Sequence, residues 1–232
     1  MIKYTPHFFL FLKIIFWGSS FPLITYSLSV LSPMELAFSR FFLPASLSVI
    51  YICFNKIFIK KEDIINFIIA GILGVFGFAF FINLGQQTLS AGAGSFIVNC
   101  NPLITSLIGV FFLKQKLKKY FCLGILMCVL GIFIISLENY EKYSFDIGTI
   151  YLLIAATLIS FYFHLLKPLV NKYGSIVTFS YTIIFGTLPM IFWSNDLYNS
   201  LTDVSFEFQL AVIWLTLFAT LIPYYTWTYS VG

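Results

Sequence analysis

Charge is scarce in this sequence of 232 residues: only 9% of them are charged, while 60% are hydrophobic. A soluble domain carries about 25% charged residues, so this chain has too little polar surface to cover itself in water. Its mean hydropathy is +0.96. The composition therefore predicts an all-α integral membrane protein in contact with a lipid bilayer. The net charge of +4 does not indicate a nucleic-acid partner, because the basic residues stand in short runs between apolar segments.

The sequence also lacks the groups that catalysis and cofactor binding need. It has no P-loop, no GxSxG motif, no paired carboxylates inside an apolar segment and no cluster of metal ligands. We therefore expect no enzyme, no cofactor, no metal and no ATP hydrolysis. Four cysteines fall in or beside apolar segments, and we interpret them as small core residues rather than a disulfide framework: Cys53, Cys100, Cys122 and Cys128.

What the chain does have is a series of apolar runs, bounded by charges and turns and long enough to cross a bilayer. Eight transmembrane helices are predicted, over residues 8–30, 34–53, 64–84, 89–113, 120–137, 147–169 and 176–193, and from 208 onward. Hydrophobicity continues beyond Gly18, so the first run is expected to be a helix rather than a cleaved signal peptide.

The lysines predict the orientation of these helices. With a cytoplasmic N-terminus, the outer loops hold only Lys142, and the inner segments hold the following set: Lys3, Lys56, Lys60, Lys61, Lys114, Lys116, Lys118, Lys119, Lys167 and Lys172. Cytoplasmic loops are enriched in basic residues, so we expect the N-terminus inside.

An internal repeat is predicted from the layout of the spans. Spans one to three and spans six to eight share an order of helices and turns, and residues 73–85 match residues 215–232 in their pattern of small and aromatic residues. Five spans separate equivalent points, an odd number, so the copies should be inverted in the membrane. Inverted repeats are typical of transporters, whose substrate sites lie at the repeat interface. We expect a first five-helix repeat at 7–137 and an incomplete second repeat of three helices at 147–232.

Several short motifs give the chain a resemblance to a known family. The motifs are Trp17-Gly-Ser-Ser-Phe21, Ser32-Pro33, Arg40-Phe-Phe, Asn101-Pro102 with the run to Phe111-Phe-Leu113, and Gly124 with Gly131. In this order and spacing they resemble the EamA-like branch of the drug/metabolite transporter superfamily. The resemblance is clear over residues 11–136 and weaker over 148–232.

This resemblance implies ten helices in two inverted repeats, a central cavity and secondary transport of small metabolites such as amino acids or drug-like compounds. Export across a bacterial inner membrane is the expected direction. The chain departs from the family at Leu113-Lys-Gln115, where an acidic residue is usual, and in having eight predicted helices, which indicates a C-terminally incomplete bundle. The alternative is a truncated, non-transporting membrane protein or interaction partner. A homodimer or a membrane partner could complete the bundle.

Polar and aromatic residues within the spans are the candidates for substrate binding: Trp17, Ser19, Ser20, Arg40, Asn99, Asn101, Tyr162 and Trp227. Arg40 is the only arginine, and a guanidinium in mid-membrane costs at least about 2.5 kcal/mol, so it should face the bundle interior. Its role could be to attract an anion or to gate. A structural pair with Glu35, or with helix-end carbonyls, is the alternative.

Two of the spans contain prolines that open the helix. Pro22 frees the carbonyl of Gly18 next to Ser19 and Ser20, for a substrate or simply for close helix packing. Pro102 follows Asn99 and Asn101, which we expect to line a cavity. In the last span, four aromatic residues fit either an interfacial belt or a cavity wall: Tyr224, Tyr225, Trp227 and Tyr229.

Other polar residues favour structural roles. Gln86 and Gln87 are expected to satisfy a helix end. His164 and Lys167 are expected to anchor the inner interface rather than to relay a proton. Glycines on one side of spans three and five predict helix-contact grooves: Gly71, Gly74, Gly77, Gly124 and Gly131.

Overall fold

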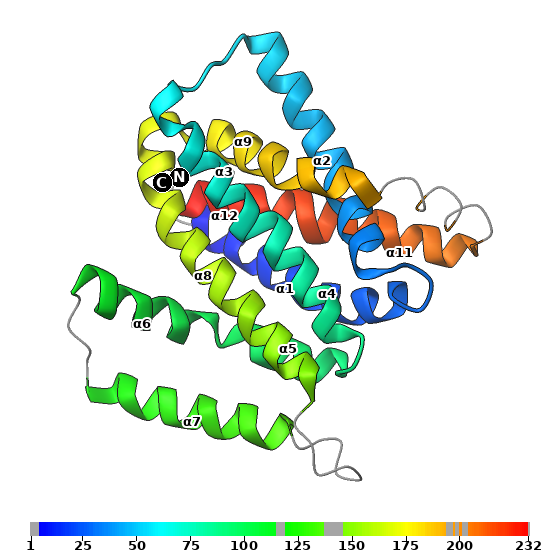
Figure 1. Cartoon of the computed structure of the whole chain (residues 1–232), viewed down its shortest axis with the longest axis vertical. Coiled ribbons are helices and arrows are strands. Elements are labelled where there is room, and N and C mark those ends of the chain that lie inside the picture. Colours follow the sequence, from blue (N-terminus) through cyan, green and yellow to red (C-terminus); the bar gives the residue numbers. More distant parts are fainter. Residues whose placement is uncertain are drawn as a thin grey trace.

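The structure, a computed structural model, describes residues 5–114, 119–136, 146–193, 197, 200 and 204–231, and all their regular elements are helical (Figure 1). In chain order these are α1 (Thr5–Ser27), α2 (Pro33–Asn55), η1 (Lys61–Asp63), α3 (Ile64–Gly71), η2 (Ile72–Gly77), α4 (Phe78–Gln86), α5 (Ala91–Asn99), α6 (Asn101–Leu113), α7 (Lys119–Ser136), α8 (Ile147–Tyr173), α9 (Ser175–Thr187), η4 (Leu188–Trp193), α11 (Phe206–Thr216), η5 (Leu217–Leu221) and α12 (Ile222–Val231). Gln115, Lys142 and the side chains of Cys122 and Tyr229 lie outside the described residues.

A helix stands at each of the eight predicted spans, which confirms a polytopic all-α membrane protein. Six helices of the described part are long and apolar enough to cross a membrane. At the other two predicted spans, α1 has 23 residues and α7 has 18. The third span is one rod, α3–η2–α4, with a π-helical turn at its middle, and the last is a second such rod, α11–η5–α12. The fourth span is broken at Cys100 into α5 and α6.

Local sequence signals fix where the helices begin and end. At α2, the Ser32 side chain accepts a hydrogen bond from the Glu35 backbone N–H, and the Glu35 carboxylate accepts one of 2.7 Å from the Ser32 backbone N–H. This reciprocal cap, with Pro33 at the first helical position, makes the turn from α1 into α2 sharp. The turn from α8 into α9 is made by Gly174, whose φ of +77° suits a residue without a Cβ.

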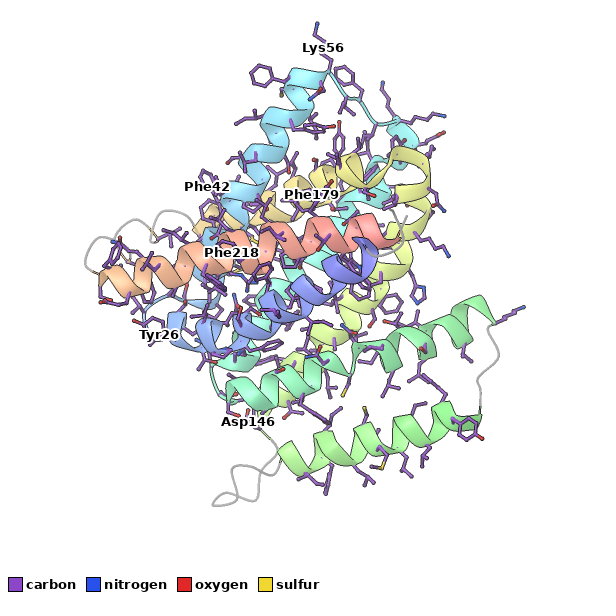
Figure 2. The ribbon with its side chains drawn as sticks, turned by 180° about the vertical axis from the view of Figure 1, so that it is seen from behind. Tyr26, Phe42, Lys56, Asp146, Phe179 and Phe218 are labelled. Carbon is purple, nitrogen blue, oxygen red and sulfur yellow. The ribbon has the colours of Figure 1, made fainter. Side chains whose placement is uncertain are left out.

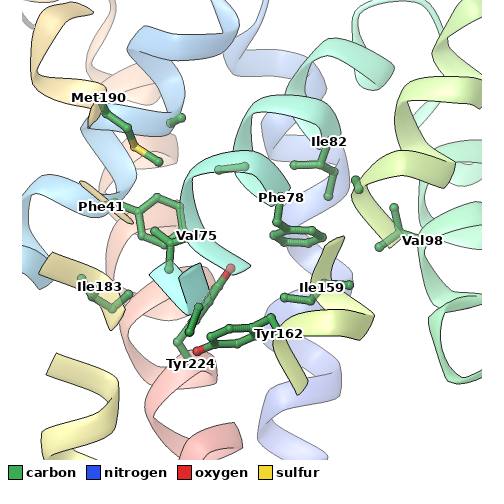
Figure 3. Close-up of a cluster of buried hydrophobic side chains, with 14 of the residues drawn as sticks. Phe41, Val75, Phe78, Ile82, Val98, Ile159, Tyr162, Ile183, Met190 and Tyr224 are labelled. Carbon is green, nitrogen blue, oxygen red and sulfur yellow. The ribbon is translucent and has the colours of Figure 1, made fainter. Parts of the chain in front are cut away.

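Small residues let the helices of the core pack closely. A Cβ on Gly74 would lie 2.2 Å from Cγ of Tyr162, so the Tyr162 ring fills the notch that Gly74 leaves. A Cβ on Gly71 would lie 2.7 Å from the backbone nitrogen of Gly186 on α9. The predicted contact groove on the third span is therefore confirmed. Figure 3 shows Tyr162 beside Tyr224 in this cluster, with Phe41 and Val75 nearby.

Helix α7 lies at the edge of the bundle, beside α5 and α6 (Figure 1). Its Gly131 faces the Phe96 ring of α5, because a Cβ there would come within 2.5 Å of Cζ. Most of its other described side chains are exposed, as a lipid-facing helix requires. Of the cysteines, Cys100 is buried as predicted, whereas Cys53 lies exposed on α2 because it faces away from the bundle.

Two polar residues join neighbouring helices within the bundle. The Gln86 amide, which is 2% exposed, donates hydrogen bonds to the Phe21 carbonyl at 2.9 Å and to Thr25 Oγ1 at 3.1 Å. The expectation that Gln86 only satisfies a helix end is therefore wrong, because the side chain faces α1. His164 donates from Nε2 to the Thr105 carbonyl at 3.0 Å and so links α8 to α6.

Candidate functional site

A cavity of about 440 Å³ lies among α1, α2, α4, the α5–α6 break, α8 and α12. It contains six of the residues predicted to bind substrate: Trp17, Ser20, Arg40, Asn99, Asn101 and Trp227. These residues come from four separate spans, so the bundle brings together what the sequence keeps as much as 210 positions apart (227 minus 17). Pockets for small ligands range from about 300 to 1,000 Å³, so this cavity fits a small molecule.

Two of the predicted residues are placed elsewhere. Ser19 donates to the Phe16 carbonyl at 2.9 Å and accepts a hydrogen bond of 3.1 Å from Trp214 Nε1, so it faces α11 rather than the cavity. Successive residues of a helix point about 100° apart, which separates Ser19 from Ser20. Tyr162 is 1% exposed and packs against Gly74, and thus belongs to the hydrophobic core.

Arg40 brings the positive charge to the cavity wall from α2. Its side chain is 4% exposed, and Nε donates a hydrogen bond of 3.2 Å to Thr220 Oγ1 in η5. Its guanidinium carbon lies 5.9 Å from the centroid of the Phe41 ring. The alternative pair with Glu35 is wrong, because that carboxylate caps α2 and accepts a hydrogen bond of 2.9 Å from the Ser200 hydroxyl. In the part of the chain that the structure describes, Arg40 has no ion pair.

The break between α5 and α6 adds two amides to the cavity wall. Asn99 donates from Nδ2 to the Ser95 carbonyl at 2.8 Å, which leaves its Oδ1 as an acceptor. The Asn101 carbonyl accepts a hydrogen bond of 3.2 Å from the Ser160 hydroxyl, and this fixes the break against α8. The carboxamide of Asn101 makes no hydrogen bond to any of the described residues. It is therefore available to a ligand.

Aromatic rings make up much of the remaining wall. The Phe163 and Trp227 ring centroids lie 4.5 Å apart, and those of Trp17 and Tyr224 lie 6.2 Å apart. For the last span, Tyr224 and Trp227 line the cavity, whereas Tyr225 is 37% exposed and does not. The cavity therefore joins one cationic group and several polar groups to a largely aromatic surface.

The sequence analysis missed several members of the wall. Phe78 and Ile82 line the cavity from α4, and Ile159 and Phe163 line it from α8. Each pair is four residues apart and so shares one helix face, which is the signal that could have grouped them. Thr220, which positions Arg40, carries no such signal because its role depends on a contact between distant spans.

Membrane-spanning helices around a partly open cavity with polar and aromatic walls define a polytopic membrane protein with a site large enough for a small molecule. A family model, that of the EamA-like transporter family, matches residues 5–137, and the chain belongs to this family. The resemblance found in the sequence is therefore confirmed, and the chain groups with transport proteins rather than with enzymes.

Individual relatives agree with this assignment. The chain is 28% identical over 220 residues to an uncharacterized transporter of Archaeoglobus fulgidus, covering 94% of this chain and 77% of that one. It is 29% identical to the uncharacterized transporter YdfC of Bacillus subtilis, covering 92% and 70%. A probable terminal-alkyne amino-acid exporter of Streptantibioticus cattleyicolor is 20% identical, covering 96% and 75%.

A solved crystal structure shares the fold. It has a TM-score of 0.65 and 18% identity, and the match covers 98% of this chain and 79% of the other.

Proposed function

We propose that this protein is a secondary transporter of small metabolites such as amino acids or drug-like compounds, and that the cavity of about 440 Å³ is its substrate site. One observation carries the proposal: six polar or aromatic residues from four spans meet on the wall of one cavity. A relative named a probable amino-acid exporter supports amino acids as substrates and export as the direction.

The inverted repeat, with copies at 7–137 and 147–232, is part of this proposal. Its support is that both rods expected to be equivalent contain a π-helical turn, η2 (Ile72–Gly77) and η5 (Leu217–Leu221). Such turns are rare in proteins, and those that occur are often found at functional sites. In transporters built from inverted repeats, one repeat rocks against the other around a fixed site. The two π-helical turns, η2 and η5, would then occupy equivalent positions in the two repeats that move.

The proposed orientation places the N-terminus in the cytoplasm of a bacterium, with the protein in the inner membrane. Lys56 and Asp146 lie at opposite ends of the molecule (Figure 2), as loops on opposite membrane sides require. In a chain freed of native cysteines, Ser29→Cys should react with an impermeant maleimide added outside, and Lys56→Cys only after permeabilisation. The opposite pattern would reverse the orientation.

The direct test is flux by the full chain in proteoliposomes. Counterflow of a panel of radiolabelled amino acids should exceed that of protein-free vesicles, and Arg40→Ala and Asn101→Ala should lower it without affecting insertion. Ser19→Ala is the matched control, because Ser19 faces away from the cavity. Unchanged flux in both cavity variants would remove the site assignment.

The second candidate is a non-transporting membrane protein that serves as an interaction partner or forms a homodimer. Its contact surface would be the exposed apolar face of α7, which includes Leu123, Met127 and Ile134. This candidate predicts no substrate-dependent flux, together with crosslinks from α7 to a second copy or another membrane protein.

A further inference from the structure

The charge on the cavity wall is unbalanced. Arg40 is the sole charged residue among those that line the cavity in the described part of the chain. It is 4% exposed, and none of the described acidic side chains lies within ion-pair distance. A buried charge is costly unless it is paired and hydrogen-bonded, so the site is electrostatically incomplete as it stands.

The hydrogen bonds of Arg40 leave part of its guanidinium free. Nε is engaged by Thr220 at 3.2 Å, and this fixes the plane of the group. The two terminal nitrogens make no hydrogen bond to the described residues. A guanidinium held at one nitrogen can still offer a pair of parallel N–H donors, the arrangement that matches the two oxygens of a carboxylate.

The other side chains of the cavity wall indicate what the rest of the ligand should be. Trp17, Phe163 and Trp227 contribute aromatic rings to the wall, and the Asn101 carboxamide at the α5–α6 break offers a polar contact. With a single positive charge and a small volume, the cavity suits one negative group on an apolar body rather than a polyanion. A cationic ligand with no anionic group would be repelled by the positive charge of Arg40.

We propose that this cavity selects small organic monocarboxylates, with the carboxylate bound by the Arg40 guanidinium and an aromatic or aliphatic body packed against Trp17 and Trp227. The inference rests on the proposed function, since it names the substrate class of the same cavity. Thr220 is a positioning residue, which acts by orienting Arg40. An α-amino group on the ligand is compatible with the site but is not required by it.

Calorimetric titration of the full chain in a non-ionic detergent tests this with three probes of nearly equal shape: phenylacetate, phenylacetamide and phenethylamine. Phenylacetate should bind more tightly than the neutral amide, with a Kd at least about tenfold lower. The amine should bind least tightly of the three. Inorganic phosphate, an anion without an apolar body, should bind more weakly than phenylacetate.

Four variants, one of them a control, separate the effect of charge from that of packing. Arg40→Gln should bind phenylacetate and phenylacetamide alike, whereas Arg40→Lys should keep part of the preference for the anion. Thr220→Val should weaken the binding of phenylacetate more than that of phenylacetamide, because the guanidinium is no longer held in a fixed plane. Ser19→Ala should match the parent chain. If Arg40→Gln does not fold, the other three variants still decide the outcome.

Several results would overturn the proposal. These are equal binding of amide and anion by the parent chain, no binding of any of the three probes, or a preference for the anion that survives in Arg40→Gln. Displacement of phenylacetate by phosphatidylglycerol at equal concentration would assign Arg40 to a lipid headgroup instead. Flux that does not depend on ligand charge would refute the inference while transport stands. Selective anion binding without flux would refute transport and leave the inference intact.

Discussion

The hydroxyl of Tyr224 donates a hydrogen bond of 2.9 Å to the carbonyl oxygen of Gly74, 150 residues earlier in the chain. Gly74 lies in the π-helical turn η2, and Tyr224 follows the second such turn, η5, by three residues (221 to 224). A π-helical turn shifts the helical hydrogen-bond ladder by one residue, which makes a carbonyl available to a partner outside the helix. The bond therefore ties the two rods together at the bundle centre, where Tyr224 also forms part of the cavity wall.

Tyr224→Phe should lower the free energy of unfolding by about 1 kcal/mol, the usual net value of one intramolecular hydrogen bond. The ring and its packing against Phe41 are kept, so the loss reports the hydroxyl alone. Equilibrium unfolding in mixed micelles of detergent and dodecyl sulfate is the measurement. Tyr225→Phe is the neighbouring control, and it should leave stability unchanged because Tyr225 lies outside the cavity and is 37% exposed. Equal effects of the two variants would show that the hydrogen bond between Tyr224 and Gly74 does not stabilise the fold.

Gly74→Ala should be more damaging, with a loss of about 1–3 kcal/mol, the usual range for an overpacked core. The added Cβ would lie 2.2 Å from the Tyr162 ring, and no rotation of that ring removes the overlap because Tyr162 is itself buried. Gly92→Ala is the matched control, since a Cβ at Gly92 meets nothing within 4 Å. Thermal unfolding in the same detergent compares the two variants. If Gly74→Ala is as stable as the parent chain, the contact between η2 and α8 can rearrange to accept the added Cβ.

The helices could be predicted because the bilayer sets their length and forbids charge within them, so eight runs of apolar residues were visible in the sequence. The interior face of each helix was harder to predict. Ser19 and Ser20 are chemically identical neighbours, and a membrane helix is apolar on its outer side as well, so periodicity does not mark the inward face.

Long-range fit explains the remaining differences between the sequence analysis and the structure. Tyr162 belongs to the core because Gly74, 88 positions away, leaves a notch of its shape. Arg40 could be predicted to face inward, since a guanidinium in lipid is expensive, but its partner Thr220 comes from another span. Such complementarity arises only in the folded bundle, so no local sequence pattern predicts it.

At the end of the molecule where α8 meets η1, an ion pair should couple the two elements. Lys172 Nζ lies 2.5 Å from Asp63 Oδ2, and the Tyr173 hydroxyl donates to the same carboxylate. A double-mutant cycle of Asp63→Asn and Lys172→Met, measured by thermal unfolding, should show a positive coupling that decreases at high salt. The pair Lys60 and Glu62, 3.8 Å apart with both side chains about two-thirds exposed, is the control and should show almost none.

The last prediction tests whether the cavity must be open for transport. Gly18 lines the cavity, and a Cβ built there meets nothing within 4 Å, so a larger side chain can enter the space without displacing its neighbours. Gly18→Leu should therefore insert and unfold like the parent chain while flux falls to the level of protein-free vesicles. Gly92→Leu adds the same side chain at an equally open glycine that does not line the cavity. Flux should survive in that variant. If both variants transport equally well, a bulky side chain on the cavity wall does not obstruct the substrate, and that result would count against the cavity as the substrate site.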